Sequence, residues 1–174
     1  MALCEKTLEA MPQKTDGNAR AVRRICFVCT GNTCRSPMAA AVANAILKEH
    51  DQTAPVCTEA FSAGLYATEG EPISPLARLA LENAGVAPIS GCDYREHTAH
   101  TLTAAEADEF DLLIPMSRAH TMELIFRFPN AVRKIVCMPH EIPDPYGRDA
   151  QTYADTLTAI EAGVRELLQG VSGK

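Results

Sequence analysis

Short apolar runs that alternate with helical segments are the feature of this sequence that most limits the fold. The runs lie at 25–28, 56–62, 111–116 and 134–138, with apolar residues at helical spacing between them. Because parallel strands need a crossover connection, this alternation predicts an α/β layer structure. We therefore expect a four-stranded parallel sheet with helices on both faces, and ligands bound beyond the carboxyl ends of its strands.

Helix start and stop signals separate these runs. Serine or threonine stands at each predicted N-cap, where its side chain can accept a hydrogen bond from the first turn. A proline follows the N-cap serine of two helices, as is common at the first helical position. One threonine and a later glutamate have the spacing of a capping box, and a glycine marks the end of one helix. These signals are Ser36-Pro37, Ser74-Pro75 with Gly85 as the stop, Thr103 with Glu106, and Ser117 before a helix to about Phe126; a final amphipathic helix is expected over 153–168.

The segment after the first apolar run carries the chemistry. Cys29 ends the predicted strand, and five residues separate it from Arg35 at a helix start. Gly31 and Asn32 tolerate left-handed backbone angles, so consecutive N–H groups can turn inward as an anion cradle, which the helix N-terminus strengthens. The Arg35 guanidinium matches two phosphate oxygens, and Ser36 can hydrogen-bond an anionic sulfur. The predicted phosphate-binding residues are Thr30, Gly31, Asn32, Thr33, Cys34 and Ser36, around Cys29 as the nucleophile.

This spacing of cysteine and arginine also occurs by chance. In that case Cys29 is a buried strand residue and Arg35 a surface residue. The glycine and asparagine inside the loop and the Ser-Pro helix start favour the phosphate site.

A cysteine nucleophile in a phosphate site could attack a phosphate ester, which predicts a phosphatase. Such an enzyme also needs a proton donor for the leaving group. Asp144 stands between Pro143 and Pro145, after the last predicted strand, and so is expected on the same sheet edge as Cys29. An aspartate between prolines is otherwise an ordinary turn residue. Together with the upstream loop, Asp144 is our candidate general acid.

The cysteines indicate neither a disulfide framework nor a metal site. There are seven, an odd number, and the N-terminal stretch lacks the apolar block of an export signal. Cys26 and Cys29 form a C-x-x-C pair, but residues three apart in a strand point to opposite faces. No second ligand pair stands at a suitable spacing, so we expect no metal site.

Length and charge set the remaining expectations. The 174 residues suit one domain over 23–174, preceded by a polar extension over 1–22 with a short helix at 2–11. A net charge of −6 argues against nucleic acid, and no apolar run is long enough to span a membrane. We expect a cytoplasmic protein that is a monomer or a weak dimer.

Three motifs resemble the low-molecular-weight protein tyrosine phosphatases: VCTGNTCRSPMA at 28–39, SAG at 62–64 and DPYG at 144–147. Weaker similarity extends from Arg24 to the last helix. The resemblance implies phosphorylated proteins as substrates and a phosphocysteine on Cys29. It also implies that Arg35 binds the transition state and that Asp144 serves as acid, then as base. The resemblance implies neither a metal nor an organic cofactor.

The resemblance further implies supporting roles. Asn32 and Ser62 look like the hydrogen-bonded pair that stabilises the loop, and His97 like the histidine that supports it. Cys34 looks like the neighbouring cysteine that forms a reversible disulfide with Cys29. One departure is His100, where the family usually has arginine.

The resemblance leaves the phosphorylated side chain open between phosphoarginine and phosphotyrosine. Tyrosine-specific members often carry a branched aliphatic residue at the position of Thr33, and a threonine resembles the arginine-phosphatase branch. Thr68 stands about where an aromatic residue usually lines the cleft, and Tyr66 is the nearest aromatic. Tyr146 is single where many relatives have two tyrosines. We expect Thr33, Tyr66 and Tyr146 to set specificity.

Two alternatives on the same fold remain open. An arsenate reductase would share Cys29 and Arg35 but needs resolving cysteines in a later loop, where Cys92 is single and Cys137 falls in a predicted strand. A non-catalytic phosphate-binding module would tend to lose the nucleophile or the acid, and both are present.

Overall fold

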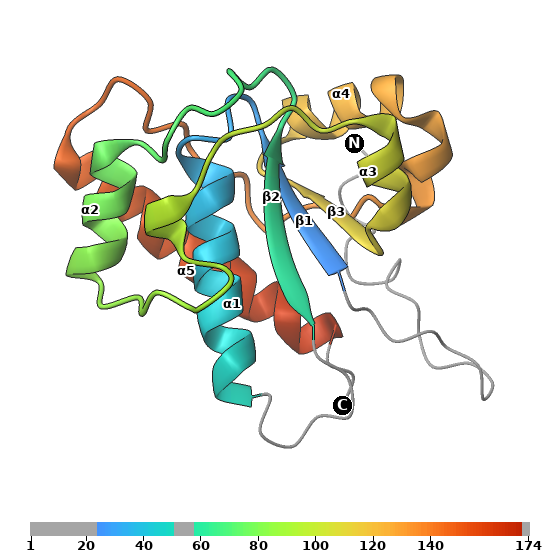
Figure 1. Cartoon of the computed structure of the whole chain (residues 1–174). Coiled ribbons are helices and arrows are strands. Elements are labelled where there is room, and N and C mark those ends of the chain that lie inside the picture. The colour runs from blue at the N-terminus through green and yellow to red at the C-terminus, as the bar shows by residue number, and fades with distance from the viewer. Residues whose placement is uncertain (1–23, 51–57, 172–174) are drawn as a thin grey trace.

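Three parallel strands form the centre of the structure, a computed structural model that describes residues 24–50 and 58–171 (Figure 1). The strands are β1 (Arg24–Cys29), β2 (Glu59–Gly64) and β3 (Leu112–Pro115). β1 lies in the middle, and its Cys29 pairs in register with Gly64 of β2. The predicted extension over 1–22 with its helix at 2–11, and the first two residues of the predicted second strand, lie outside the described residues.

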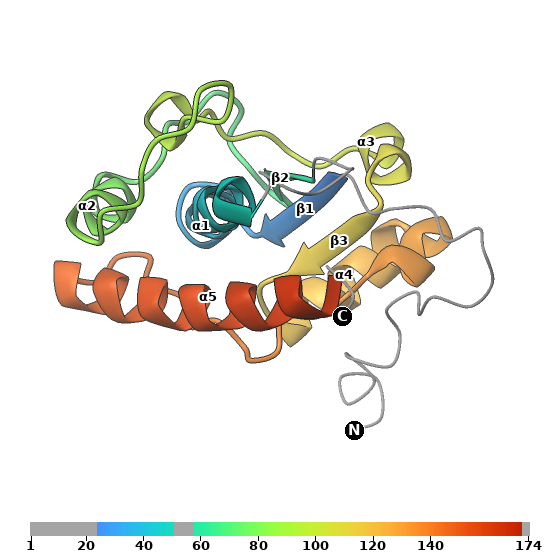
Figure 2. The same cartoon turned by 90° about the horizontal axis from the view of Figure 1, so that it is seen from below.

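The central strand shows why helices cover both faces of the sheet. Alternate side chains of β1 belong to two separate cores, Ile25, Phe27 and Cys29 to one and Cys26 and Val28 to the other. On the first face lie α1 (Arg35–His50) and α5 (Ala150–Val171), with α2 (Pro75–Asn83) packed against α5; on the second lie α3 (Ala104–Glu109) and α4 (Arg118–Arg127) (Figure 2). The prediction of two covered faces is confirmed.

The prediction of a fourth strand over 134–138 is wrong. Residues Pro129–Lys134 form a 3₁₀ helix, η2, that begins at a proline and takes up the first residue of the expected strand. Only one bridge to the sheet remains, in which the Val136 N–H donates to the Leu113 carbonyl at 3.0 Å. Pro139 has no N–H to extend the ladder. The described sheet therefore has three strands, and Cys137 lies outside them.

The helix boundaries follow most of the predicted signals. Thr103 and Glu106 form both halves of a capping box, and the Ser117 side chain accepts from the N–H of His120. Two serines behave differently from the prediction. α1 begins one residue before Ser36, and Ser74 is an N-cap by position without a side-chain capping bond, because both hydroxyls bond elsewhere.

The carboxyl ends of the strands meet at one edge, and the loop after β1 packs directly on the end of β2. The N–H groups of Leu65 and Tyr66 donate to the carbonyls of Cys29 and Thr30, both at 2.9 Å. A Cβ at Gly64 would lie 2.8 Å from the Thr30 carbonyl oxygen, so only glycine fits without a shift. This contact fixes the position of the predicted phosphate loop.

Candidate active site

The predicted nucleophile lies at the end of β1, beneath a tightly folded loop. Cys29 is 3% exposed, and its Sγ lies 3.0 Å from the Ser36 Oγ at the start of α1. The Asn32 Nδ2 donates to the same Ser36 oxygen at 3.0 Å. That oxygen accepts from Asn32, and the single Ser36 hydroxyl proton is shared between the sulfur and the Ala63 carbonyl, 3.3 Å away. The structure thus brings the three residues together.

The turn of the loop depends on one residue, Asn32. Its φ of +56° is the only positive φ of a non-glycine residue in the described part of the chain. Asparagine tolerates this left-handed conformation better than most residues. Gly31 has no positive φ, so the expectation that both residues adopt left-handed angles holds only for Asn32.

The main chain of the loop is left with free donors. Within the described ranges, the N–H groups of residues 31–34 donate to no protein acceptor. Asn32, Thr33 and Cys34 are nevertheless buried. Since buried N–H groups are rarely left unpaired, these donors suit an anion bound in the loop.

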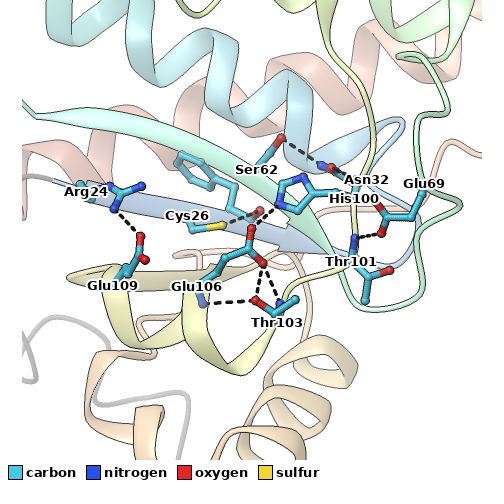
Figure 3. Close-up of polar contacts among 11 residues, drawn as sticks. Arg24, Cys26, Asn32, Ser62, Glu69, His100, Thr101, Thr103, Glu106 and Glu109 are labelled. Carbon is cyan, nitrogen blue, oxygen red and sulfur yellow. Dashed lines mark hydrogen bonds and ion pairs between the residues drawn. The ribbon is translucent and has the colours of Figure 1, made fainter.

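A second layer of contacts holds Asn32 in place (Figure 3). Its Nδ2 donates to the Ser62 Oγ at 2.9 Å, and its Oδ1 accepts from the His100 N–H at 3.2 Å. The Asn32 carbonyl lies 2.7 Å from the His97 Nε2, which carries the proton because a carbonyl oxygen only accepts. Burial lowers the pKa of His97, so its ring is neutral. Both supporting residues expected from the resemblance, Ser62 and His97, therefore touch Asn32.

His100, where the family usually has arginine, contacts Asn32 through its main chain. Its N–H bonds to Asn32, while its side chain turns away and its Nε2 lies 3.3 Å from a Glu106 carboxylate oxygen (Figure 3). The side chain of His100 therefore takes no part in the contacts that hold Asn32.

Arg35 and Asp144 meet although 109 positions separate them in the sequence. The Arg35 Nη2 donates to the Asp144 Oδ2 at 2.6 Å. The Arg35 side chain is 7% exposed and that of Asp144 53%, so the carboxylate reaches the buried guanidinium from the solvent side. The Asp144 Oδ1 also accepts from the Tyr146 N–H at 3.2 Å. The loop that carries Asp144 is tied to the residue after β3 by the Ile142 N–H, which donates to the Met116 carbonyl at 3.0 Å.

Cys26, the other half of the C-x-x-C pair, is chemically separate from this site. Its side chain faces the opposite core, and burial raises the pKa of its thiol, which keeps it protonated. Within the described residues, no group of three His, Cys, Asp or Glu side chains could hold a metal ion. No described helix is both long and apolar enough to cross a membrane.

Comparison with known proteins gives the family. The family model described as low molecular weight phosphotyrosine protein phosphatase matches residues 24–174. The chain belongs to this family. The protein-arginine-phosphatase of Geobacillus stearothermophilus is 32% identical over 153 residues, which cover 84% of this chain and 94% of that protein.

Two solved structures support the assignment of this low molecular weight phosphatase. The low molecular weight protein tyrosine phosphatase of T. tengcongensis is 32% identical with a TM-score of 0.75, and the match covers 84% of this chain and 98% of that one. A mutant of the arginine phosphatase YwlE with a phosphorylated active-site serine is 26% identical with a TM-score of 0.75. This match covers 86% of this chain and 95% of that one. The family and its fold are therefore established for this chain.

Two exposed tyrosines lie beside the predicted site residues. Tyr66 is 61% exposed and Tyr146 74% exposed. Tyr66 is held from both ends, because its N–H donates to Thr30 in the loop and its hydroxyl donates to the Glu123 carboxylate at 2.6 Å. The Arg127 guanidinium stacks on its ring, 4.0 Å from the centroid. Thr68, where family members often have an aromatic residue, is exposed.

Thr33 and Cys34 lie on the inner side of the loop. Thr33 is 8% exposed, with its Oγ1 3.6 Å from the Cys34 Sγ. That sulfur is 3.2 Å from the Tyr153 hydroxyl of α5, which also accepts from Ser74. Burial and the contact with Cys34 raise the pKa of Tyr153 to about 12. The predicted specificity residue is therefore packed beside the predicted redox cysteine.

His120 is a residue of the site that the sequence analysis missed. Its Nε2 lies 2.9 Å from the Thr30 Oγ1 in the loop, and its Nδ1 lies 2.9 Å from the Ser117 Oγ. One signal could have indicated it: His120 stands in the first turn of the helix after β3, where the carboxyl edge of the sheet was expected.

Proposed function

We propose that this phosphatase cleaves phosphorylated protein side chains by transferring the phosphoryl group to Cys29, and that it prefers phosphoarginine to phosphotyrosine. The observation that supports it most is the buried loop with free N–H donors, closed by a guanidinium and a carboxylate in contact. In the first step the Cys29 sulfur attacks phosphorus while the loop N–H groups and Arg35 bind the phosphoryl oxygens. Ser36 donates to the sulfur, which eases its later departure.

Asp144 completes the two steps. Its carboxylic acid protonates the leaving nitrogen or oxygen as the bond to phosphorus breaks. The resulting carboxylate then removes a proton from water, which attacks the phosphocysteine and releases inorganic phosphate and the Cys29 thiolate. The ion pair between Arg35 and Asp144 implies that substrate phosphate displaces the carboxylate from the guanidinium.

The preference for phosphoarginine rests on two features of the site. Asp144 already accepts a hydrogen bond from one guanidinium, so it can also face that of the substrate. The buried loop position has the polar Thr33 and no aliphatic side chain to pack against a phenol ring. A second candidate is phosphotyrosine, which the exposed rings of Tyr66 and Tyr146 favour.

The test is phosphate release from two peptides of one sequence, bearing phosphoarginine or phosphotyrosine. We expect faster release from phosphoarginine, and a Thr33→Ile variant shifted toward phosphotyrosine. Wild-type preference for phosphotyrosine, unchanged in Thr33→Ile, would overturn the substrate assignment. Release from neither peptide would overturn the phosphatase mechanism, as would full activity of Cys29→Ser. Arsenate-dependent oxidation of thioredoxin would favour the reductase alternative.

We also propose that the enzyme acts in the cytoplasm as a monomer or weak dimer, on phosphorylated proteins and not on nucleic acid. Thiols such as that of Cys29 are kept reduced in that compartment. The net charge of −6 opposes nucleic acid, which leaves the local cradle to hold the phosphate.

A further inference from the structure

His120 is a buried histidine with both ring nitrogens in use. It is 6% exposed and belongs to the first turn of α4. Its Nε2 contacts Thr30, the residue directly after Cys29, and its Nδ1 contacts Ser117, the N-cap of its own helix. The ring thus lies between the phosphate loop and the start of α4, across 90 positions of sequence.

Burial and a nearby positive charge keep this ring neutral. Burial and the positive charge of Arg35 lower the pKa of His120 to about 4, against weaker opposing effects of Asp144 and Glu141. A neutral imidazole has one donor and one acceptor nitrogen, which suits a ring between two hydroxyl groups. The Ser117 oxygen already accepts from the His120 N–H, so its hydroxyl can donate to Nδ1 while Nε2–H donates to Thr30.

Thr30 is held from two directions. Its side chain bonds to His120 on α4, while its carbonyl accepts from the Tyr66 N–H. A shift of Thr30 would move the Cys29–Thr30 peptide and, with it, the sulfur relative to the loop donors. A misplacement of about 1 Å can cost an enzyme on the order of 10²-fold in rate.

We propose that His120 is a positioning residue of the active site, which clamps Thr30 to α4 and so fixes the phosphate loop beside Cys29. The inference rests on the proposed function where its test measures turnover of a phosphate ester. His120 acts through Thr30 and touches no reacting atom. Its loss should therefore lower kcat and weaken oxyanion binding.

The test compares variants that keep or remove the hydrogen-bonding group of His120 or of Thr30. His120→Leu keeps the volume without hydrogen bonds, whereas His120→Gln retains a side-chain N–H at a reach similar to Nε2. Thr30→Val removes the loop hydroxyl and keeps its shape. The readouts are kcat and KM with an aryl phosphate, the affinity for inorganic phosphate by calorimetry, and the melting temperature.

We expect His120→Leu and Thr30→Val each to lower kcat about tenfold and to weaken phosphate binding, and His120→Gln to restore most of both. The double variant His120→Leu, Thr30→Val should be no worse than either single variant, because the two act on one contact. A lower melting temperature with unchanged kcat and phosphate affinity would overturn the proposal, as would additive effects on kcat.

Failure of the clamp and failure of the proposed function give different results. If wild type releases no phosphate from any ester, the proposed function fails, and the phosphate-binding data alone decide on the clamp. If His120→Leu does not fold, Thr30→Val carries the test, because Thr30 lies on the exposed side of the loop.

Discussion

Replacement of Asn32 should destabilise the protein by an amount that the structure allows us to divide into two parts. The residue is fully buried, and its side chain makes three hydrogen bonds, to the Ser36 and Ser62 hydroxyls and from the His100 N–H. Its backbone is left-handed, with φ +56°. Alanine removes the bonds and strains the backbone, whereas glycine removes the bonds alone.

The two variants should differ by the backbone contribution. Three buried hydrogen bonds at about 1 kcal/mol each predict a loss of about 3 kcal/mol in the free energy of unfolding for Asn32→Gly. Alanine in a left-handed conformation costs roughly 1 kcal/mol more, so Asn32→Ala should lose about 4 kcal/mol. Turnover should fall at least tenfold in both, because Ser36 loses the donor that orients its hydroxyl toward Cys29.

Urea denaturation at pH 7 and 25 °C, with kcat measured on the same samples, tests this division. Asn44 supplies a matched control: it is also a buried asparagine, and it exchanges two 2.8 Å hydrogen bonds with the Ala60 main chain. Asn44→Ala should lose about 2 kcal/mol and keep wild-type kcat in folded samples. Equal stabilities of Asn32→Gly and Asn32→Ala would refute the backbone contribution, and a loss below about 1 kcal/mol in both would refute the hydrogen-bond contribution.

Three further predictions concern single residues. Cys29→Ser should abolish turnover and still bind inorganic phosphate; calorimetry that detects no phosphate binding would contradict the cradle. Asp144→Asn should slow hydrolysis roughly 10²–10⁴-fold for poor leaving groups and less for p-nitrophenol, and an equal effect on both would argue against a proton donor. Folding lowers the pKa of His120 from its ordinary 6.5 to about 4, so between these pH values the ring is protonated in the unfolded chain and neutral in the folded protein. Its contribution to stability is therefore full above pH 6.5 and falls as the pH drops. Between pH 7 and pH 5, wild type should lose roughly 1–2 kcal/mol more stability in denaturation than His120→Gln, after allowance for solvent screening.

The sequence was most informative where a function depends on residues close together in the chain. Cys29, Arg35 and the loop between them lie within seven positions, and a strand end followed by a helix start already implies an anion site. The contact of Asp144 with Arg35 could also be expected, because prolines mark its loop and parallel strands bring their ends to one edge. The capping box at Thr103 and the cap at Ser117 are similarly local, and both form as expected.

Other features depended on how distant segments pack. The expected fourth strand is lost to a 3₁₀ helix that starts at Pro129, since a short apolar run does not by itself decide between a strand and a single bridge. The Ser36 hydroxyl bonds to Cys29 and not to its own helix, because the end of β2 and Asn32 surround it.

What the sequence by itself determined is the alternating α/β order of elements and the strand–loop–helix segment that holds Cys29 and Arg35, since these follow from the conformational preferences of adjacent residues. The tertiary structure alone decided that His100 supports Asn32 through its main chain and that His120 holds Thr30. Those contacts join residues 68 and 90 positions apart. Their formation depends on the packing of whole elements around the sheet, which no local pattern of residues records.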